Sequence, residues 1–337
     1  MIKEAIATLV CGRSLSMEEA TAAMEEIMDG QATPSQLSAF IVALKIKGET
    51  IDEITGLVRT MRARAIPVRT SGPVVDIVGT GGDLAGTFNI STTAAFVAAG
   101  AGLKVAKHGN RAASSQCGSA DVLEALGIRI ALSAEEVTRC LNEVGMAFMF
   151  APVFHPAMKH AAVPRREIGI PTVFNILGPL TNPAGARSQV LGVAEELLVK
   201  KMAAVLKNLN SHHAMVVHGE DGLDEITIAG RTSICELRNG SIREYSVCPE
   251  DFGLSRAVPA SLKGGCASEN AAILRRILAG EPGPKRDVVL LNAAAALVAG
   301  DLSPSLAEGI GLAKETIDSG RALDKLEGLI KFSRSAG

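Results

Sequence analysis

Residues 74 to 126 read VVDIVGTGGDLAGTFNISTTAAFVAAGAGLKVAKHGNRAASSQCGSADVLEAL. The stretch opens with a β-branched run of the kind that forms a buried strand. Glycines follow in Gly79 to Asp83 (GTGGD), and glycine lets a backbone turn sharply and bring its N–H groups close to a ligand. An apolar, helix-like run at 94–101 follows NIST (89–92). Ser91 is thus expected near a helix N-terminus, where free N–H groups and the helix dipole favour an anion.

A second unit of the same kind follows directly. A strand is predicted at 104–106, and it leads into the basic loop KHGNRAASS at 107–115, which carries cations, hydroxyls and a glycine. Ser119 then begins another predicted helix. Two strand ends therefore deliver two anion-binding loops to one edge of a sheet, where open α/β sheets bind ligands. Neither loop has the glycine spacing of a P-loop or a dinucleotide fingerprint. The plain alternative for the first loop by itself is a tight turn.

The composition limits what class of protein this is. The chain has 337 residues, which is room for one large domain or two unequal ones, and it is 47% hydrophobic but only 3% aromatic. Its core must therefore consist of Ala, Leu, Val and Ile. A net charge of −2 and the absence of tryptophan argue against a nucleic-acid-binding protein, which would need a broad basic surface or stacking platforms. Any anion site must be local.

The cysteines and the ends of the chain indicate a cytoplasmic protein. The six cysteines are scattered without zinc or disulfide spacing, so reduced thiols are expected. Cys117 lies beside the basic loop, but no His/Asn partner set indicates a nucleophile. The first ten residues lack the apolar core of a signal peptide, and the apolar run at 293–300 is too short to span a bilayer.

The first 64 residues are predicted to be helical. Ser16 and Thr50 each begin a capping box with a glutamate three residues later, and Thr33 is followed by proline at the first helical position. We expect three helices, at 20–28, 37–46 and 51–64. Short amphipathic helices need an apolar partner, which is either the rest of this chain or a second subunit.

Three later segments carry candidate functional groups. The acidic segment HGEDGLDE (218–225) follows a predicted strand and suits a hard cation with oxygen ligands, although by itself it could be an acidic turn. The Arg165-Arg166 pair could match a carboxylate in two hydrogen bonds or could be a solvated helix end after a helix at 156–163. Residues 175–183 are punctuated by Gly and Pro and could be a plain hinge, but we interpret them as the segment where the chain crosses back from the helical part to the sheet, so that closure can bring two substrates together. The other histidines lack metal-ligand spacing and are expected at the surface or in packing; they are His155, His160, His212 and His213.

Six motifs together resemble the anthranilate phosphoribosyltransferases. They are GTGGD (79–83), NIST (89–92), KHGNR (107–111), GSADVLE (118–124), NILGPLTNP (175–183) and HGEDGLDE (218–225). They keep the family's order over almost the whole chain. The sugar-phosphate loop alone would be shared with pyrimidine nucleoside phosphorylases, the alternative enzyme class. The Asp224-Glu225 pair argues against that alternative, because phosphorolysis needs no metal-bound diphosphate.

The resemblance implies a fold and a reaction. The fold is a small all-helical domain plus a larger α/β domain with a central, mostly parallel sheet. The helical domain would span 1–68, completed by about 156–185, and the α/β domain 73–155 and 186–337. A homodimer would form through the N-terminal helices. The reaction, a step of tryptophan biosynthesis, would transfer the phosphoribosyl group of 5-phosphoribosyl diphosphate to the amine of anthranilate, with Mg²⁺ as cofactor.

The resemblance also implies the site residues. Those for the donor are Gly79, Gly82, Asp83, Thr87, Asn89, Ile90, Ser91, Thr92, Lys107, His108, Gly109, Asn110, Arg111, Ala112, Ala113, Ser114, Ser115 and Ser119. Those for anthranilate are Gly79, Asn110 and Arg165. Those for the metal are Ser91, Asp224 and Glu225. His108 is the candidate for proton transfer, or it simply lines the acceptor pocket. Near that pocket the chain departs from the family's usual pattern at Val163-Pro164 and at Pro171.

Overall fold

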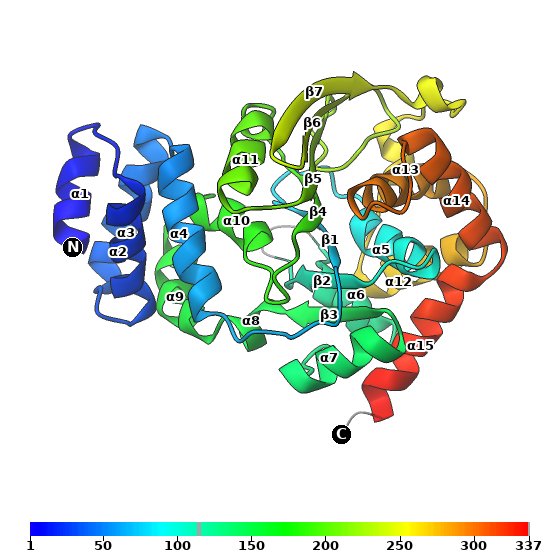
Figure 1. The fold of residues 1–337 in the computed structure, drawn as a ribbon, viewed down its shortest axis with the longest axis horizontal. Helices are drawn as coiled ribbons and strands as arrows, with labels where there is room; N and C mark the ends of the chain where they lie inside the picture. Colours follow the sequence, from blue (N-terminus) through cyan, green and yellow to red (C-terminus); the bar gives the residue numbers. More distant parts are fainter. Residues whose placement is uncertain (113–115, 336–337) are drawn as a thin grey trace.

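A seven-stranded sheet forms the centre of the larger part of the molecule (Figure 1). The computed structural model describes residues 1–112 and 116–335. The strand order is β3-β2-β1-β4-β5-β6-β7, parallel from β3 to β5 and antiparallel beyond. The strands are β1 Val75–Gly79, β2 Val105–Gly109, β3 Met146–Phe150, β4 Ser188–Gly192, β5 His213–Gly219, β6 Thr232–Arg238 and β7 Ser241–Val247. The predicted mostly parallel sheet is confirmed.

Four helices at the N-terminal end form a bundle that lies beside the sheet (Figure 1). They are α1 Ile2–Val10, α2 Met17–Met28, α3 Pro34–Lys47 and α4 Ile51–Arg64. Capping boxes at Ser16, Thr33 and Thr50 begin the last three. Helix α1 was not predicted, because Met1 offers no side-chain cap that would mark its start.

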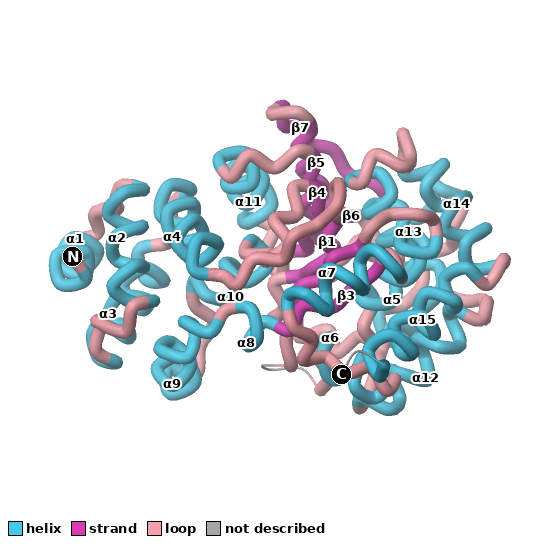
Figure 2. Tube along the Cα trace, turned by 60° about the horizontal axis from the view of Figure 1, so that its bottom comes forward, coloured by secondary structure: helices cyan, strands magenta, loops and turns pink. Residues whose placement is uncertain are grey.

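The two faces of the sheet pack against different helices (Figure 2). Alternate residues of a strand point to opposite faces, and Leu191 and Val216 belong to the core shared with the bundle and with α11 Leu197–Asn208. Val190 and Met215 face the second core. The helices in or beside that second core are α5 Ile90–Gly100, α6 Ser119–Ala125, α7 Ala134–Glu143, α12 Ala267–Leu278, α13 Pro284–Ala299, α14 Leu306–Asp318 and α15 Arg321–Ser335.

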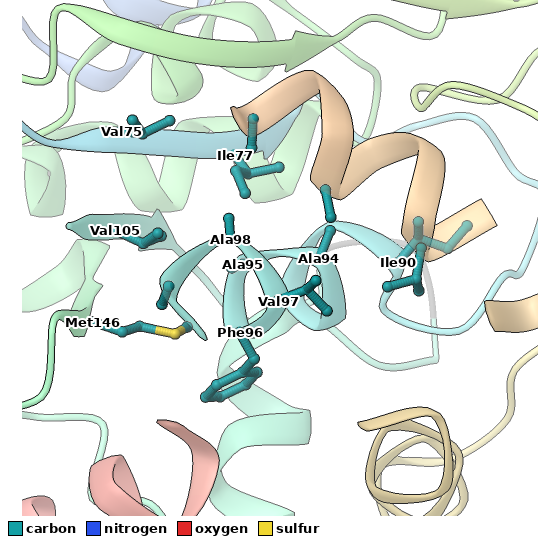
Figure 3. Packing of buried hydrophobic residues seen from close by; sticks show 14 of the residues in the cluster. Val75, Ile77, Ile90, Ala94, Ala95, Phe96, Val97, Ala98, Val105 and Met146 are labelled. Carbon is teal, nitrogen blue, oxygen red and sulfur yellow. The ribbon is translucent and has the colours of Figure 1, made fainter. Parts of the chain in front are cut away.

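Helix α5 packs closely against β1 and β2. Figure 3 shows Val75 and Ile77 of β1 on the side of α5 that carries Ala94, Ala95 and Ala98. These alanines are fully buried, and their small side chains let the helix approach the strands. The N-terminus of α5 is thereby fixed near the carboxyl end of β1, as the strand–loop–helix pattern predicted.

The chain crosses from the sheet to the bundle and back between residues 151 and 187. It forms α8 Ala151–Phe154, α9 Lys159–Ile168, α10 Val173–Leu177 and the 3₁₀ turn Gly178–Leu180. Pro164 lies inside α9, so the predicted end of that helix near residue 163 is wrong, and the arginine pair is helical. Residues 175–183 are mostly helical, and the chain leads from them back to the sheet at β4.

Asn182 fastens the end of this crossover to the sheet. Its buried amide Nδ2 donates to Asp76 Oδ2 at 2.7 Å and to the carbonyl of Ala106 at 2.8 Å. Asp76 belongs to β1 and Ala106 to β2, so one side chain joins the returning segment to two neighbouring strands. A buried polar network whose members are all satisfied stiffens the place where it lies.

Candidate active site

A cavity of about 600 Å³ opens at the carboxyl ends of β1 and β2. Most of the predicted site residues line it: Gly79, Gly82, Asp83, Thr87, Asn89, Ile90, Ser91, Thr92, Lys107, His108, Gly109, Asn110, Arg111, Ala112, Ser119, Asp224 and Glu225. Ala113, Ser114 and Ser115 lie outside the described residues. The structure thus brings the two loops and the acidic segment to one place.

Two glycines allow Asp224 to lie against the ends of β1 and β4. A Cβ added to Gly79 would be 2.2 Å from Asp224 Oδ2, and one added to Gly192 would be 1.6 Å from the Asp224 carbonyl oxygen. The N–H of Gly81 also donates to Asp224 Oδ2 at 2.7 Å. Any larger side chain at these two positions would overlap Asp224. The two glycines therefore leave the space that Asp224 occupies above the Gly79–Asp83 loop.

Ser91 lies between Glu225 and the buried Lys107. Its backbone N–H donates to Glu225 Oε1 at 3.1 Å, across 134 positions of sequence, and Lys107 Nζ lies 3.4 Å from Ser91 Oγ. Lys107 also donates to the carbonyl of Ile77. Burial lowers the pKa of Lys107, while Asp76 and the acidic pair oppose that shift. The predicted metal residues and the basic loop therefore share one polar cluster.

The carboxyl groups of Asp83, Asp224 and Glu225 are not neutralised by the positive charge around them. Burial and the Asp83 carboxyl raise the pKa of Asp224 to about 7, and burial and Asp224 raise that of Glu225 to about 8. Burial also raises the pKa of Asp83. Neighbouring carboxylates in a poorly solvated site favour a bound cation, and oxygen ligands suit Mg²⁺.

The acids do not by themselves complete a metal site. Within residues 1–112 and 116–335, no three His, Cys, Asp or Glu side chains are grouped so that they could hold a metal ion. Magnesium commonly uses one or two protein carboxylates and takes its remaining ligands from water and substrate phosphates. Asp224, Glu225 and Ser91 fit that mode.

His108 is buried beside a second histidine. Its ring centroid is 5.1 Å from that of His155, and the Nε2 atoms of both rings are buried without a hydrogen-bond partner among the described residues. Burial, then His155, lowers the pKa of His108 to about 3, and burial also lowers the pKa of His155. Burial therefore favours the neutral form of both rings. The backbone N–H of His108 donates to Asp76 Oδ1 at 3.2 Å.

Two of the predicted cations are directed to other partners. Arg111 forms ion pairs with Asp121 and Glu124 of α6, so its charge is largely engaged at the rim. Arg165 does not line the cavity. Its guanidinium lies 5.0 Å from the ring centroid of Phe174, and burial lowers its pKa. Its role toward anthranilate stays a prediction.

One wall of the cavity was missed by the sequence interpretation. Lys263, Gly264 and Gly265 line it, and the N–H of Gly264 donates to the Gly86 carbonyl at 3.0 Å. The Gly-Gly pair was a signal of close backbone approach, but the sequence gives no indication of which loop it approaches.

The comparisons with known proteins agree with this geometry. A family described as "Glycosyl transferase family, a/b domain" matches residues 71–323, and "Glycosyl transferase family, helical bundle domain" matches residues 3–65. The fold and the cavity thus define the class of protein: the chain is a glycosyl transferase that has a helical bundle domain.

Among the described residues, no helix is long and apolar enough to cross a membrane.

Individual relatives narrow the class. An anthranilate phosphoribosyltransferase of Dehalococcoides mccartyi is 59% identical over 99% of both chains, and one of Chloroflexus aggregans is 61% identical over 99% of this chain and 98% of its own. The crystal structure of the Thermus thermophilus enzyme of that name superposes with a TM-score of 0.93 at 47% identity, covering 98% of this chain and 99% of the other. The chain belongs to the anthranilate phosphoribosyltransferases.

Proposed function

We propose that this protein transfers the 5-phosphoribosyl group from 5-phosphoribosyl diphosphate to the amine of anthranilate, a step of tryptophan biosynthesis. The observation that carries the proposal is the meeting of the glycine loop, the basic loop and the Asp224-Glu225 pair around one cavity. A related enzyme of Saccharomyces cerevisiae, 30% identical over 99% of this chain and 98% of its own, with a TM-score of 0.91, has been solved with that donor and magnesium.

The donor carries several negative charges, and the residues of the cavity suit them. The positive end of the α5 dipole lies at Ile90 and Ser91, whose own N–H groups donate to the Phe88 carbonyl and to Glu225, and Lys107 adds a buried cation. Ser91, Asp224 and Glu225 would hold Mg²⁺, which offsets charge on the diphosphate leaving group when bound. The loops then position the ribose and exclude water while positive charge develops at its C1 atom.

The acceptor needs orientation more than a base. An aromatic amine is already neutral at physiological pH, so it can attack without prior loss of a proton. With a pKa of about 3, His108 is a weak base, which favours the alternative that it lines the acceptor pocket beside His155. We assign Asn110 and Arg165 to orienting the anthranilate carboxylate.

One assay tests the proposal. Purified protein is mixed with the donor, Mg²⁺ and anthranilate, and the loss of anthranilate fluorescence is followed. Product should form, and excess EDTA should stop the reaction. Thymidine cleavage by phosphate in place of this reaction would favour the phosphorylase alternative, and a mobility shift of nucleic acid at physiological salt would favour a nucleic-acid-binding role.

We further propose a cytoplasmic homodimer built through a helical domain of residues 1–68 and about 156–185. Val10 and Ile46, at the ends of α1 and α3, are 68% and 82% exposed. Large apolar side chains on an N-terminal bundle suit a contact with a second copy. All six cysteines are free, which suits a reducing compartment.

A further inference from the structure

Asn270 lies behind the cavity and does not line it. It is on α12, it is 1% exposed, and its amide makes two hydrogen bonds with other segments. Its Nδ2 donates to Asn89 Oδ1 at 3.0 Å, and its Oδ1 accepts from the N–H of Gly265 at 2.8 Å. One buried side chain thus joins the residue before α5 to the wall of residues 263–265.

Asn89 carries the connection to a third loop. It is the N-cap residue of α5, yet its side chain makes no cap bond to that helix. Its Nδ2 donates to the carbonyl of Cys117 at 3.2 Å, and its Oδ1 accepts from Asn270. Cys117 follows the basic loop and lines the cavity. The Asn89–Asn270 amide pair therefore links three separate segments of the cavity wall.

The backbone around this pair is closely packed. The N–H of Phe88 donates to the Leu262 carbonyl at 3.1 Å, and Thr87 forms an isolated antiparallel bridge with Lys263. A Cβ added to Gly264 would lie 2.5 Å from Asn270 Oδ1 and 2.7 Å from the Cα of Phe88. Gly264 thus lies directly against Asn270 and Phe88 with no room for a side chain, and the neighbouring Gly265 is bonded to Asn270.

We infer that Asn270 is a positioning residue for phosphoribosyl diphosphate, acting through Asn89 and the wall at Gly265. The inference rests on the proposed function. An asparagine amide supplies one donor and one acceptor group, and both are used here. An aspartate at position 270 would replace the donating Nδ2 by an oxygen, which would then face Asn89 Oδ1 without a hydrogen bond. Rotating the Asn89 amide would not relieve that contact, because an oxygen would then face the Cys117 carbonyl.

The test is donor binding and kinetics in Asn270→Asp. Titration calorimetry with donor and Mg²⁺ should give a dissociation constant raised roughly tenfold or more, as expected for unpaired buried acceptors, with the anthranilate KM within about twofold of the wild type. Leu274→Ala is the matched control. It removes a fully buried side chain one turn further along α12, so it should lower the melting temperature but leave donor binding unchanged.

Each outcome decides the question. A donor dissociation constant raised by less than about tenfold in Asn270→Asp overturns the inference, and so does an equal change for both substrates or an equal loss of donor binding in Leu274→Ala. If the aspartate variant does not fold, Asn270→Ser provides the same comparison, because its shorter hydroxyl cannot span both partners. A wild-type protein that makes no product would instead overturn the proposed function.

Discussion

At the scale of single residues, Asp224 and Glu225 combine burial, like charge and proximity to Ser91. Such a cluster is costly in the free protein, because each ionised carboxylate lacks solvent and lies near another. Functional sites often retain this kind of cost, because a bound cation removes it. The arrangement therefore supports the proposal that these acids bind a cation.

We expect Asp224→Asn and Glu225→Gln each to lower turnover by roughly 100-fold or more, since a metal supplies several kcal/mol of charge stabilisation in the transition state. Both variants should fold, because an amide has nearly the same shape and removes a repulsive charge. Steady-state rates at saturating Mg²⁺ and circular dichroism check the two statements. Wild-type kinetics in both variants would remove these residues as metal ligands.

Arg165→Ala should raise the anthranilate KM by about tenfold or more while the donor KM changes little, because a charged hydrogen bond to a carboxylate is lost. In the structure Arg165 lies over Phe174, outside the cavity lining. The result therefore also reports whether the side chain turns toward substrate. A larger effect on the donor KM would contradict the assignment.

At the scale of elements, the ends of β1 and β4 hold the acidic segment in place. Gly192→Ala should destabilise the protein by about 3 kcal/mol, as overpacking does, and should lower turnover at least tenfold, because a small displacement of a site is costly. The Cβ of an alanine at position 192 would lie 1.6 Å from the Asp224 carbonyl oxygen. Gly192 itself does not line the cavity, so any loss of activity would come through Asp224. Denaturant unfolding and the fluorescence assay measure both effects.

Gly311→Ala is the control for that substitution. Gly311 lies in α14 with no atom within 4 Å of an added Cβ, so alanine should be neutral or should stabilise the helix by up to about 1 kcal/mol. Equal losses of activity in both variants would show that glycine replacement alone, and not the contact with Asp224, is responsible.

The pairing of β5 with β6 contains a charged network far from the cavity. His213 is fully buried between Asp301 at 3.0 Å and Glu236 at 2.9 Å, and Glu236 also accepts from Tyr245. The hydrogen bond with His213 lowers the pKa of Glu236. Burial would raise the pKa of Asp301, but the hydrogen bonds with His212 and His213 outweigh it and the pKa is lowered. Arg238 lies 3.1 Å from Asp301.

Carboxyl groups with lowered pKa values stabilise the fold above their ordinary pKa and lose that contribution as the pH falls through the folded value. The wild type should therefore lose stability below about pH 4.5, the ordinary value for Glu236. Glu236→Gln should be about 1–2 kcal/mol less stable at pH 7 and should lose less on acidification. Urea unfolding at pH 7 and pH 3.5 checks this, and parallel losses in both proteins would refute it.

Local patterns predicted most elements because their signals lie within a few residues. Met146–Phe150 is a run of apolar residues and forms β3, and the Asn239-Gly240 pair, a strong hairpin signal, forms the turn between β6 and β7 with φ of 49° and 79°. Pro164 misled the interpretation, because a proline usually ends a helix, whereas here it lies buried within α9. The signal for β1 was likewise local, as its β-branched residues show.

Features that depend on distant contacts were not predictable. The wall of residues 263–265 pairs with residues 86–88, and no short-range pattern indicates such a partner. The stacking of Arg165 on Phe174 and the ion pairs of Arg111 likewise follow from tertiary placement. The meeting of Ser91 with Glu225 could be inferred only from the resemblance, and the structure shows that contact directly.

At the scale of the whole molecule, the bundle is continuous with one core of the sheet. Leu57 and Val58 of α4 share a cluster with Leu191 and Val216 of the strands. Helix α4 packs on α10 and α11, so removing the first 64 residues would expose those helices as well as any dimer contact. Surface substitutions test the proposed dimer more cleanly than truncation does.

The double variant Val10→Asp/Ile46→Asp should sediment as a monomer, because two charges would replace apolar groups at the proposed interface, while the wild type sediments as a dimer. Both side chains are exposed, so the melting temperature of the subunit should change little. Sedimentation equilibrium decides the point. A variant that remains dimeric would place the contact elsewhere.

The amide of Asn182 restrains the sheet beneath the cavity while substrates bind and products leave. It bonds to β1 and β2 at once, which makes the junction between the crossover and the sheet stiff. The stretch from Gly81 to Gly86 lies outside any helix or strand, and three of its glycines and the 86% exposed Leu84 adopt left-handed backbone. We therefore expect any motion that admits substrate or releases product to occur at the rim, while the floor beneath the reactants stays fixed.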